Sequence, residues 1–180
     1  MHHIPRSSYT HKPWKNGLGT TEEIFVYPEG ASDFLVRLSM ATLTTSGPFS
    51  LFPGIDRTLV LLEGRPIKLN GRSVPLLTPI AFPGEDLLHS TLEAPGLDFN
   101  LMCRRGQARG VVHVLNGEST TTADAHLSVV FALTDHVRVG EIELRKYDAC
   151  VVEGPVEIKG SAYLRVEIQF QIPHQVIKNT

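Results

Sequence analysis

Polar groups that could do chemistry gather first in residues 14–24, Trp-Lys-Asn-Gly-Leu-Gly-Thr-Thr-Glu-Glu-Ile. Two glycines two positions apart allow a tight backbone turn and the close approach of another group. Beside them, Lys15, Asn16, Thr21 and Glu23 offer hydrogen-bond donors and acceptors of both charge signs. The segment is not a P-loop, because no Gly-Lys-Ser/Thr follows, and it lacks the strand-then-helix context of a dinucleotide-binding turn. A binding loop and a plain polar loop before a first strand both fit this pattern.

Residues 47–57, Gly-Pro-Phe-Ser-Leu-Phe-Pro-Gly-Ile-Asp-Arg, place an arginine directly before an apolar run. Arg57 is charged at all physiological pH values and presents a planar fork of donors that suits a carboxylate or a phosphate. Ser50 and Phe52 stand a few residues earlier and could supply a polar contact and an apolar wall. The alternative is an ion pair between Arg57 and Asp56 or another surface acid.

Two alternating runs each carry polar groups on one face. Arg37 and Ser39 share a face in the first run, and Asp98 and Asn100 share a face in the second, because side chains alternate along a strand. Such a face often points to water, but in a barrel that opens at one end it can line a pocket. Burying Arg37 and Arg57 without an anion would be costly. If both point inward, Asp98 or a bound ligand must therefore compensate them.

The other reactive residue types form no recognisable site in the sequence. The eight histidines are scattered, and His89 is separated from the nearest Pro-Gly turn by more than a metal motif requires. Cys103 and Cys150 lie in apolar runs and are expected to be buried thiols. No Gly-x-Ser-x-Gly and no Cys-x-x-Cys motif is present. We expect no metal and no other cofactor.

The composition is that of an ordinary globular protein with one sizeable domain or two small lobes that share a core, since 42% of its 180 residues are hydrophobic and 20% charged. The net charge of -2 provides no excess of positive charge for binding nucleic acid or an anionic membrane. Arg104, Arg105 and Arg109 are more typical of a solvated connector. No run approaches the roughly 18 apolar residues of a membrane span, and no signal core opens the chain, so we expect a cytoplasmic location.

The elements that must position these groups are short strands. Apolar residues recur with period two almost throughout, and no window of helical length shows an amphipathic stripe. Turn signals interrupt the runs at short intervals, and Asn70-Gly71 is a candidate type I′ hairpin. The pattern predicts an all-β protein, either a sandwich, a jelly roll or a barrel. Residues 104–110 form a soft boundary, beyond which the strands are plainly alternating and show little chemistry.

A set of motifs runs in order through residues 14–105. The motifs are Trp14-Lys-Asn-Gly-x-Gly19 with Thr21-x-Glu23-Ile24, Arg37-x-Ser39-x-Ala41, Gly47-Pro-Phe-Ser-x-Phe-Pro-Gly54 with Asp56-Arg57, Phe82-x-Gly84-Glu85, and Asp98-Phe-Asn-Leu-Met102. Together they resemble the HutD/Ves family, which often has aspartate where Glu85 stands. Beyond residue 110 the resemblance rests on the strand pattern alone.

This resemblance implies a double cupin, with two RmlC-like jelly-roll barrels in one compact unit. Residues 1–106 would form the lobe with the ligand pocket, and residues 107–180 a degenerate second lobe. HutD proteins accompany bacterial histidine-utilisation genes and look like regulators, so the implied ligand is a small anionic metabolite such as formylglutamate or urocanate. Ves proteins are linked to environmental stress. The residues implied to line the pocket are Lys15, Asn16, Thr21, Glu23, Arg37, Ser50, Phe52, Arg57, Asp98 and Asn100.

Metal-binding cupins place His-x-His and then Glu shortly before a strand that ends in Leu-Glu-Gly. Ser50, Leu51 and Phe52 occupy the histidine region here, and Arg57 lies near the glutamate position. An arginine cannot ligate a divalent cation, so the expected ligand changes from a metal to an anion.

Three functions stay open on the sequence alone. The first is a binding module for a small carboxylate, with no nucleic-acid or membrane partner. The second is a metal-independent lyase, isomerase or hydrolase that acts on a small organic acid, with Lys15 and Glu23 as acid and base. The third is a cupin lobe used only to form a homodimer, which would have a filled apolar barrel.

Overall fold

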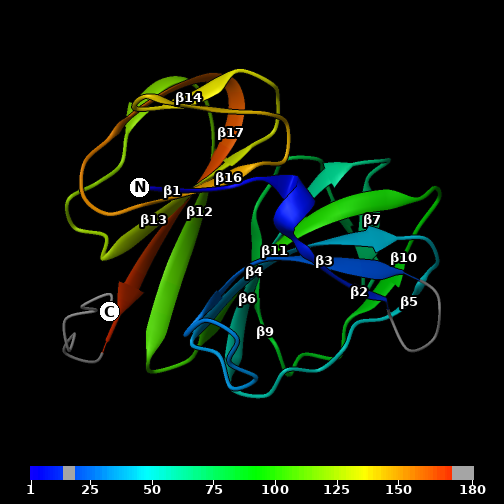
Figure 1. Cartoon of the computed structure of the whole chain (residues 1–180). Helices are drawn as coiled ribbons and strands as arrows, with labels where there is room; N and C mark the ends of the chain where they lie inside the picture. The colour runs from blue at the N-terminus through cyan, green and yellow to red at the C-terminus, as the bar shows by residue number, and fades with distance from the viewer. Residues whose placement is uncertain (14–18, 172–180) are drawn as a thin grey trace.

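The computed structural model describes residues 1–13 and 19–171 and contains almost only β-strands (Figure 1). Its one helical element in the described part is a single 3-10 turn, η1 (Arg6–Ser8). The strands form two lobes side by side, one from each half of the chain. The prediction of an all-β fold is confirmed.

The N-terminal lobe has a six-stranded antiparallel sheet in the order β2-β3-β4-β11-β6-β9 and a four-stranded sheet in the order β5-β10-β7-β8. The bounds of the larger sheet are β2 (Thr10–Pro13), β3 (Thr20–Tyr27), β4 (Val36–Leu43), β11 (Gly96–Arg104), β6 (Ile55–Glu63) and β9 (Ile80–Pro83). Those of the smaller are β5 (Gly47–Pro48), β10 (His89–Thr91), β7 (Ile67–Leu69) and β8 (Arg72–Val74). Asn70 and Gly71 join β7 to β8 with φ of 48° and 82°, the two positive values that a type I′ hairpin needs.

The C-terminal lobe is a seven-stranded sheet in the order β1-β16-β13-β17-β14-β15, with β12 on the other edge of β17. The bounds are β1 (His2–Ile4), β16 (Ala149–Val152), β13 (Leu127–Ala132), β17 (Glu157–Phe170), β14 (Val137–Val139), β15 (Ile142–Leu144) and β12 (Ala108–Thr120). The strand pairing places β1 in this sheet and β2 in the other, so the first residues of the chain lie with the second lobe. The boundary at residue 106 stays a prediction.

One hydrophobic core joins the two lobes. Leu38 and Leu101 of the N-terminal sheet belong to the same buried cluster as Val129 and Leu164 of the C-terminal sheet. Because side chains alternate along a strand, the residues next to these point to the opposite faces, into each lobe. The buried polar residues Ser39 and Asn100 lie on such an inner face.

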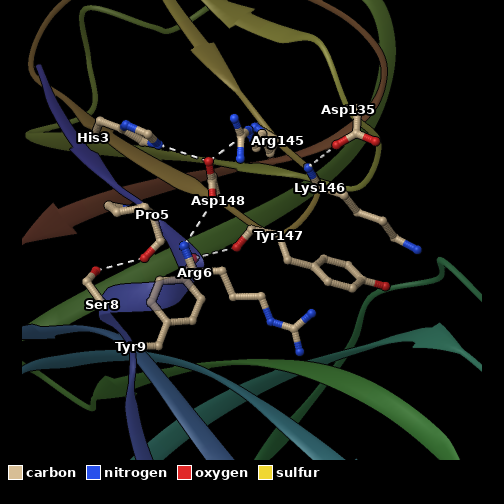
Figure 2. A network of polar contacts seen from close by, with 10 residues as sticks. All are labelled: His3, Pro5, Arg6, Ser8, Tyr9, Asp135, Arg145, Lys146, Tyr147 and Asp148. Carbon is tan, nitrogen blue, oxygen red and sulfur yellow. Dashed lines mark hydrogen bonds and ion pairs between the residues drawn. The ribbon is translucent and has the colours of Figure 1, made fainter.

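The N-terminal segment, with His3 and Arg6, contacts the buried carboxylate of Asp148 in the second lobe (Figure 2). Asp148 accepts hydrogen bonds from the backbone N–H groups of Arg6 at 2.9 Å and of Arg145 at 3.2 Å, and its Oδ2 lies 3.0 Å from His3 Nε2. Close by, the hydroxyl of Tyr9 donates to the backbone oxygen of Tyr147 at 2.7 Å. The crossing from β1 to β2 is therefore fixed by polar contacts with the second lobe.

Replacing Asp148 with alanine is expected to lower the free energy of unfolding by about 1.5–3 kcal/mol, because two partly buried hydrogen bonds from backbone N–H groups lose their charged acceptor. Urea unfolding curves with an unchanged slope would measure the loss. Asp135→Ala is the matched control, since this exposed carboxylate accepts a single bond from Lys146 N at 2.9 Å. An equal loss in both variants would contradict the role given to Asp148.

Candidate functional site

Arg57 on β6 is the centre of the polar cluster inside the N-terminal lobe. It is 7% exposed, and its Nη2 donates to Asn100 Oδ1 at 2.9 Å while its Nη1 donates to the Ser50 backbone oxygen at 3.3 Å. Its buried Nε has no acceptor among the described residues. Three aromatic rings surround the guanidinium, with centroids 5.1–5.4 Å from Cζ: Phe49, Phe52 and Phe82.

The loop that carries two of these rings is held by a close backbone approach at Gly84. Phe52 N donates to Gly84 O at 2.8 Å, and Gly84 N donates to Ile55 O at 2.6 Å. A Cβ at residue 84 would lie 2.4 Å from Phe52 O, closer than real Cβ atoms come, so a side chain would push the loop away. The glycine thereby keeps Phe52 against Arg57.

Asp98 is linked to Arg57 through Asn100, which hydrogen-bonds to both residues. Asn100 Nδ2 donates to Asp98 Oδ1 at 2.8 Å, and Asp98 is only 2% exposed. Burial raises the pKa of Asp98 to about 7, against the opposing effects of the Arg57 charge and of hydrogen bonds from Asn100 and Ala41 N. Burial also lowers the pKa of Arg57 to about 10, which leaves it charged at neutral pH. At neutral pH Asp98 is therefore only partly ionised and balances Arg57 incompletely.

The charge of Arg37 on β4 is balanced by a different acid. Its Nε lies 3.0 Å from Glu23 Oε2, an ion contact in which the N–H does not point along a hydrogen bond. Lys12 Nζ lies 2.8 Å from both oxygens of Glu23. The expectation that Asp98 or a ligand must compensate both arginines thus holds only for Arg57, because β3 supplies Glu23 to Arg37.

Strand register brings most of the candidate residues onto one inner face. Across β3, β4, β11 and β6, one row holds Glu23, Ser39 and Asn100, and the next holds Arg37 and Arg57 on either side of Met102. Thr21 and Asp98 flank Ala41 in a third row. We call the group formed by Glu23, Arg37, Ser39, Arg57, Asp98 and Asn100 the Arg57 cluster.

The remaining candidates differ in what they contribute. Ser50 is exposed and offers its backbone oxygen, whereas Phe52 stacks on Arg57. Lys15 and Asn16 lie outside the described residues, and with them the proposed acid of an enzymatic mechanism. Sequence reasoning missed the rings of Phe49 and Phe82, although both stand inside the motifs that also contain Phe52 and Gly84.

A separate groove of about 370 Å³ lies on the opposite face of the same strands, toward β12 of the second lobe. Thr58, Cys103 and Arg109 line it, from β6, β11 and β12. Arg57 and Phe82 border the groove through their strands, while the contacts of the Arg57 side chain lie on the opposite face. This groove is therefore distinct from the Arg57 cluster.

Two features are absent from the described residues. No group of three or more His, Cys, Asp and Glu side chains in residues 1–13 and 19–171 could hold a metal ion. No helix in this part of the chain is long and apolar enough to cross a membrane. The absence of a metal cofactor stays a prediction.

Comparison with known proteins places the chain in a family. The HutD family model matches residues 6–169, which is most of the chain. The chain belongs to the HutD family. A HutD relative, Protein Ves from Citrobacter koseri, is 34% identical over 135 residues, covering 71% of this chain and 70% of Ves. HutD from Pseudomonas fluorescens SBW25 (formate condition) is 26% identical with a TM-score of 0.86, over 95% of this chain and 99% of that protein.

More distant structures share the fold alone. The bacterial pirin YhhW from Escherichia coli, solved in complex with nickel(II), aligns with a TM-score of 0.66 at 11% identity over 95% of this chain and 99% of its own. The predicted cupin fold of this HutD-family chain is confirmed by such neighbours.

Proposed function

We propose that this HutD-family protein binds a small anionic metabolite, with Arg57 as the main contact for a ligand carboxylate. The observation that carries the proposal is a charged, 7% exposed guanidinium whose Nε has no acceptor among the described residues. A buried cation that lacks a full counter-charge gains free energy from an anion. Because Asp98 is only partly ionised, it does not fully neutralise Arg57, and the anion supplies the remaining counter-charge.

The neighbours of Arg57 suit such a ligand. The ring faces of Phe49, Phe52 and Phe82 pack against the guanidinium and fix its plane, so that its edge is the part left for hydrogen bonding. Asn100 and Ser39 on the same inner face can bind the rest of a small polar molecule. We further propose that the ligand is a formylglutamate- or urocanate-like acid. The proposed role of the protein is regulatory, in histidine utilisation.

Replacing Arg57 with lysine is expected to weaken carboxylate binding at least about tenfold, because a lysine keeps the charge but loses the donor fork. Calorimetry with formylglutamate and with urocanate measures the change. Arg138→Lys, on the exposed face of β14, is the control and should bind as the parent does. Equal affinity in the parent and in Arg57→Lys would refute the proposed site.

The same samples separate binding from catalysis. If the protein only binds, the metabolite is recovered unchanged after long incubation at saturating protein. Turnover that disappears in Glu23→Gln would instead support the metal-independent enzyme.

A further inference from the structure

The C-terminal lobe repeats the strand arrangement that holds the Arg57 cluster. In the first lobe, β11 lies between β4 and β6, and in the second, β17 lies between β12 and β13. One row of the first lobe pairs Ser39, Asn100 and Leu59, and one row in the same strand order of the second lobe pairs His113, Arg165 and Val130. The strands run in the same relative directions in both sets.

The adjacent row of the second lobe pairs Val111, Glu167 and Ser128. Since Val129, Leu164 and Val166 point into the shared core, the residues between them point into the second lobe. The inner face of the second lobe thus carries its own polar group, which we call the His113 cluster: His113, Ser128, Arg165 and Glu167.

The contacts inside this cluster leave hydrogen-bonding capacity unused. Arg165 Nη1 donates to Thr120 O at 2.8 Å, and its Nη2 lies 3.1 Å from Glu167 Oε1 without aligned geometry. His113 Nε2 lies 3.5 Å from Glu167 Oε2. Among the described residues, the buried Arg165 Nε has no acceptor and the buried Glu167 Oε1 has no aligned donor. Arg37 and Arg57 of the first cluster show the same unused Nε.

Accessibility and charge distinguish the two clusters. The His113 side chain is 37% exposed, and Val111 beside it is exposed as well, so solvent reaches the edge of the cluster, while Arg165 Nε and Glu167 Oε1 lie buried beneath it. The charges of Arg165 and Glu167 cancel, whereas Arg57 is incompletely balanced. An unused donor beside an unused acceptor, without net charge, matches a primary carboxamide, whose oxygen accepts and whose NH₂ donates.

We propose that the His113 cluster is a second small-molecule site, for a ligand with a primary carboxamide group. The carboxamide oxygen accepts from Arg165 Nε, and its NH₂ donates to Glu167 Oε1. The buried Ser128 hydroxyl lies in the same row as Glu167 and closes the inner side. This proposal does not depend on the function of the Arg57 cluster.

Propanamide and propanoate are the test ligands, because they have the same shape and differ in charge. Titrated into the full chain and followed by NMR, propanamide should shift the resonances of His113, Val111 and Val130 and saturate in the millimolar range expected for so few atoms. Propanoate should shift these resonances at least fivefold less at equal concentration. No saturable shift with propanamide, or a stronger one with propanoate, would overturn the proposal.

Glu167→Gln should reverse this preference, because Arg165 then lacks its counter-charge and attracts the carboxylate. Glu153→Gln, an exposed change of the same kind on the same lobe, should leave the preference as in the parent. Arg165→Lys, which removes the Nε–H, should abolish the propanamide shifts and serves as the second variant if Glu167→Gln does not fold. An unchanged preference in a folded Glu167→Gln variant would count against the site. The propanamide shifts should persist in Arg57→Lys. Failure of the Arg57 cluster to bind a carboxylate can therefore be told apart from failure of the His113 cluster to bind propanamide.

Discussion

Carboxylate binding is expected to weaken by up to about tenfold for each pH unit above about 7, and Asp98→Asn should remove this dependence. Burial raises the pKa of Asp98 to about 7, so the carboxyl is protonated below that pH and charged above it. A bound anion repels the charged form, so binding takes up a proton once Asp98 is ionised. Over two pH units the parent therefore loses up to about a hundredfold in affinity, which is the limit for the uptake of one proton. Calorimetry measures this loss of affinity, with a carboxylate ligand whose own charge is constant above about pH 6.

The ligand-free protein provides an independent check of the same group. Because the folded pKa of Asp98 lies above the unfolded value of about 3.9, its contribution to stability is fully present below about pH 4. That contribution is lost as the pH rises toward about 7. Asp98→Asn should therefore flatten the stability curve between these limits. Glu23, Arg37 and Arg57 face the same cluster and are unchanged in the variant, so an equal pH dependence in the parent and in Asp98→Asn would contradict the assignment to Asp98.

Replacing Phe131 with alanine should lower the free energy of unfolding by about 3–5 kcal/mol, the largest stability loss we expect for one residue. Phe131 is fully buried, and its ring centroid lies 5.1 Å from that of Phe99 in the other lobe and 5.7 Å from that of Tyr147. The side chain therefore supports both lobes at once. For a chain of this length the melting temperature should fall by roughly 6–20 °C.

Scanning calorimetry of Phe131→Ala also tests whether the lobes unfold together. A single transition at lower temperature is expected, because the cavity opens in the core that both lobes share. Phe131→Leu is the conservative comparison and should cost less than about 1.5 kcal/mol. Two transitions, of which only one moves, would show that the lobes are separate folding units.

Period-two alternation was enough to predict which residues of the first lobe share a face. Arg37 and Ser39 lie on one face of β4, and Asp98 and Asn100 lie on one face of β11, because side-chain direction is a local property of a strand. The hairpin at Asn70 was predictable for the same reason, since the conformation of a two-residue turn depends on its own residues.

Contacts between distant strands could not be read from the sequence. The meeting of Arg37 with Glu23 depends on a register shift between Glu23 and Phe25, which changes the residues that face each other across β3 and β4. The His113 cluster joins β12, β13 and β17, whose residues look like ordinary alternation because no motif links them. The aromatic rings around Arg57 likewise come from three separate segments.

The crossing of β1 into the second lobe sets an order of events during protein synthesis. His3 leaves the ribosome early, yet its partner Asp148 follows 145 residues later. Until β16 has been made, β1 has an unpaired edge that could pair wrongly with another chain. Contacts over such a separation are also slow to form, because a long loop must close first. A strand that is made well before its partner is thus among the last parts of the fold to become native.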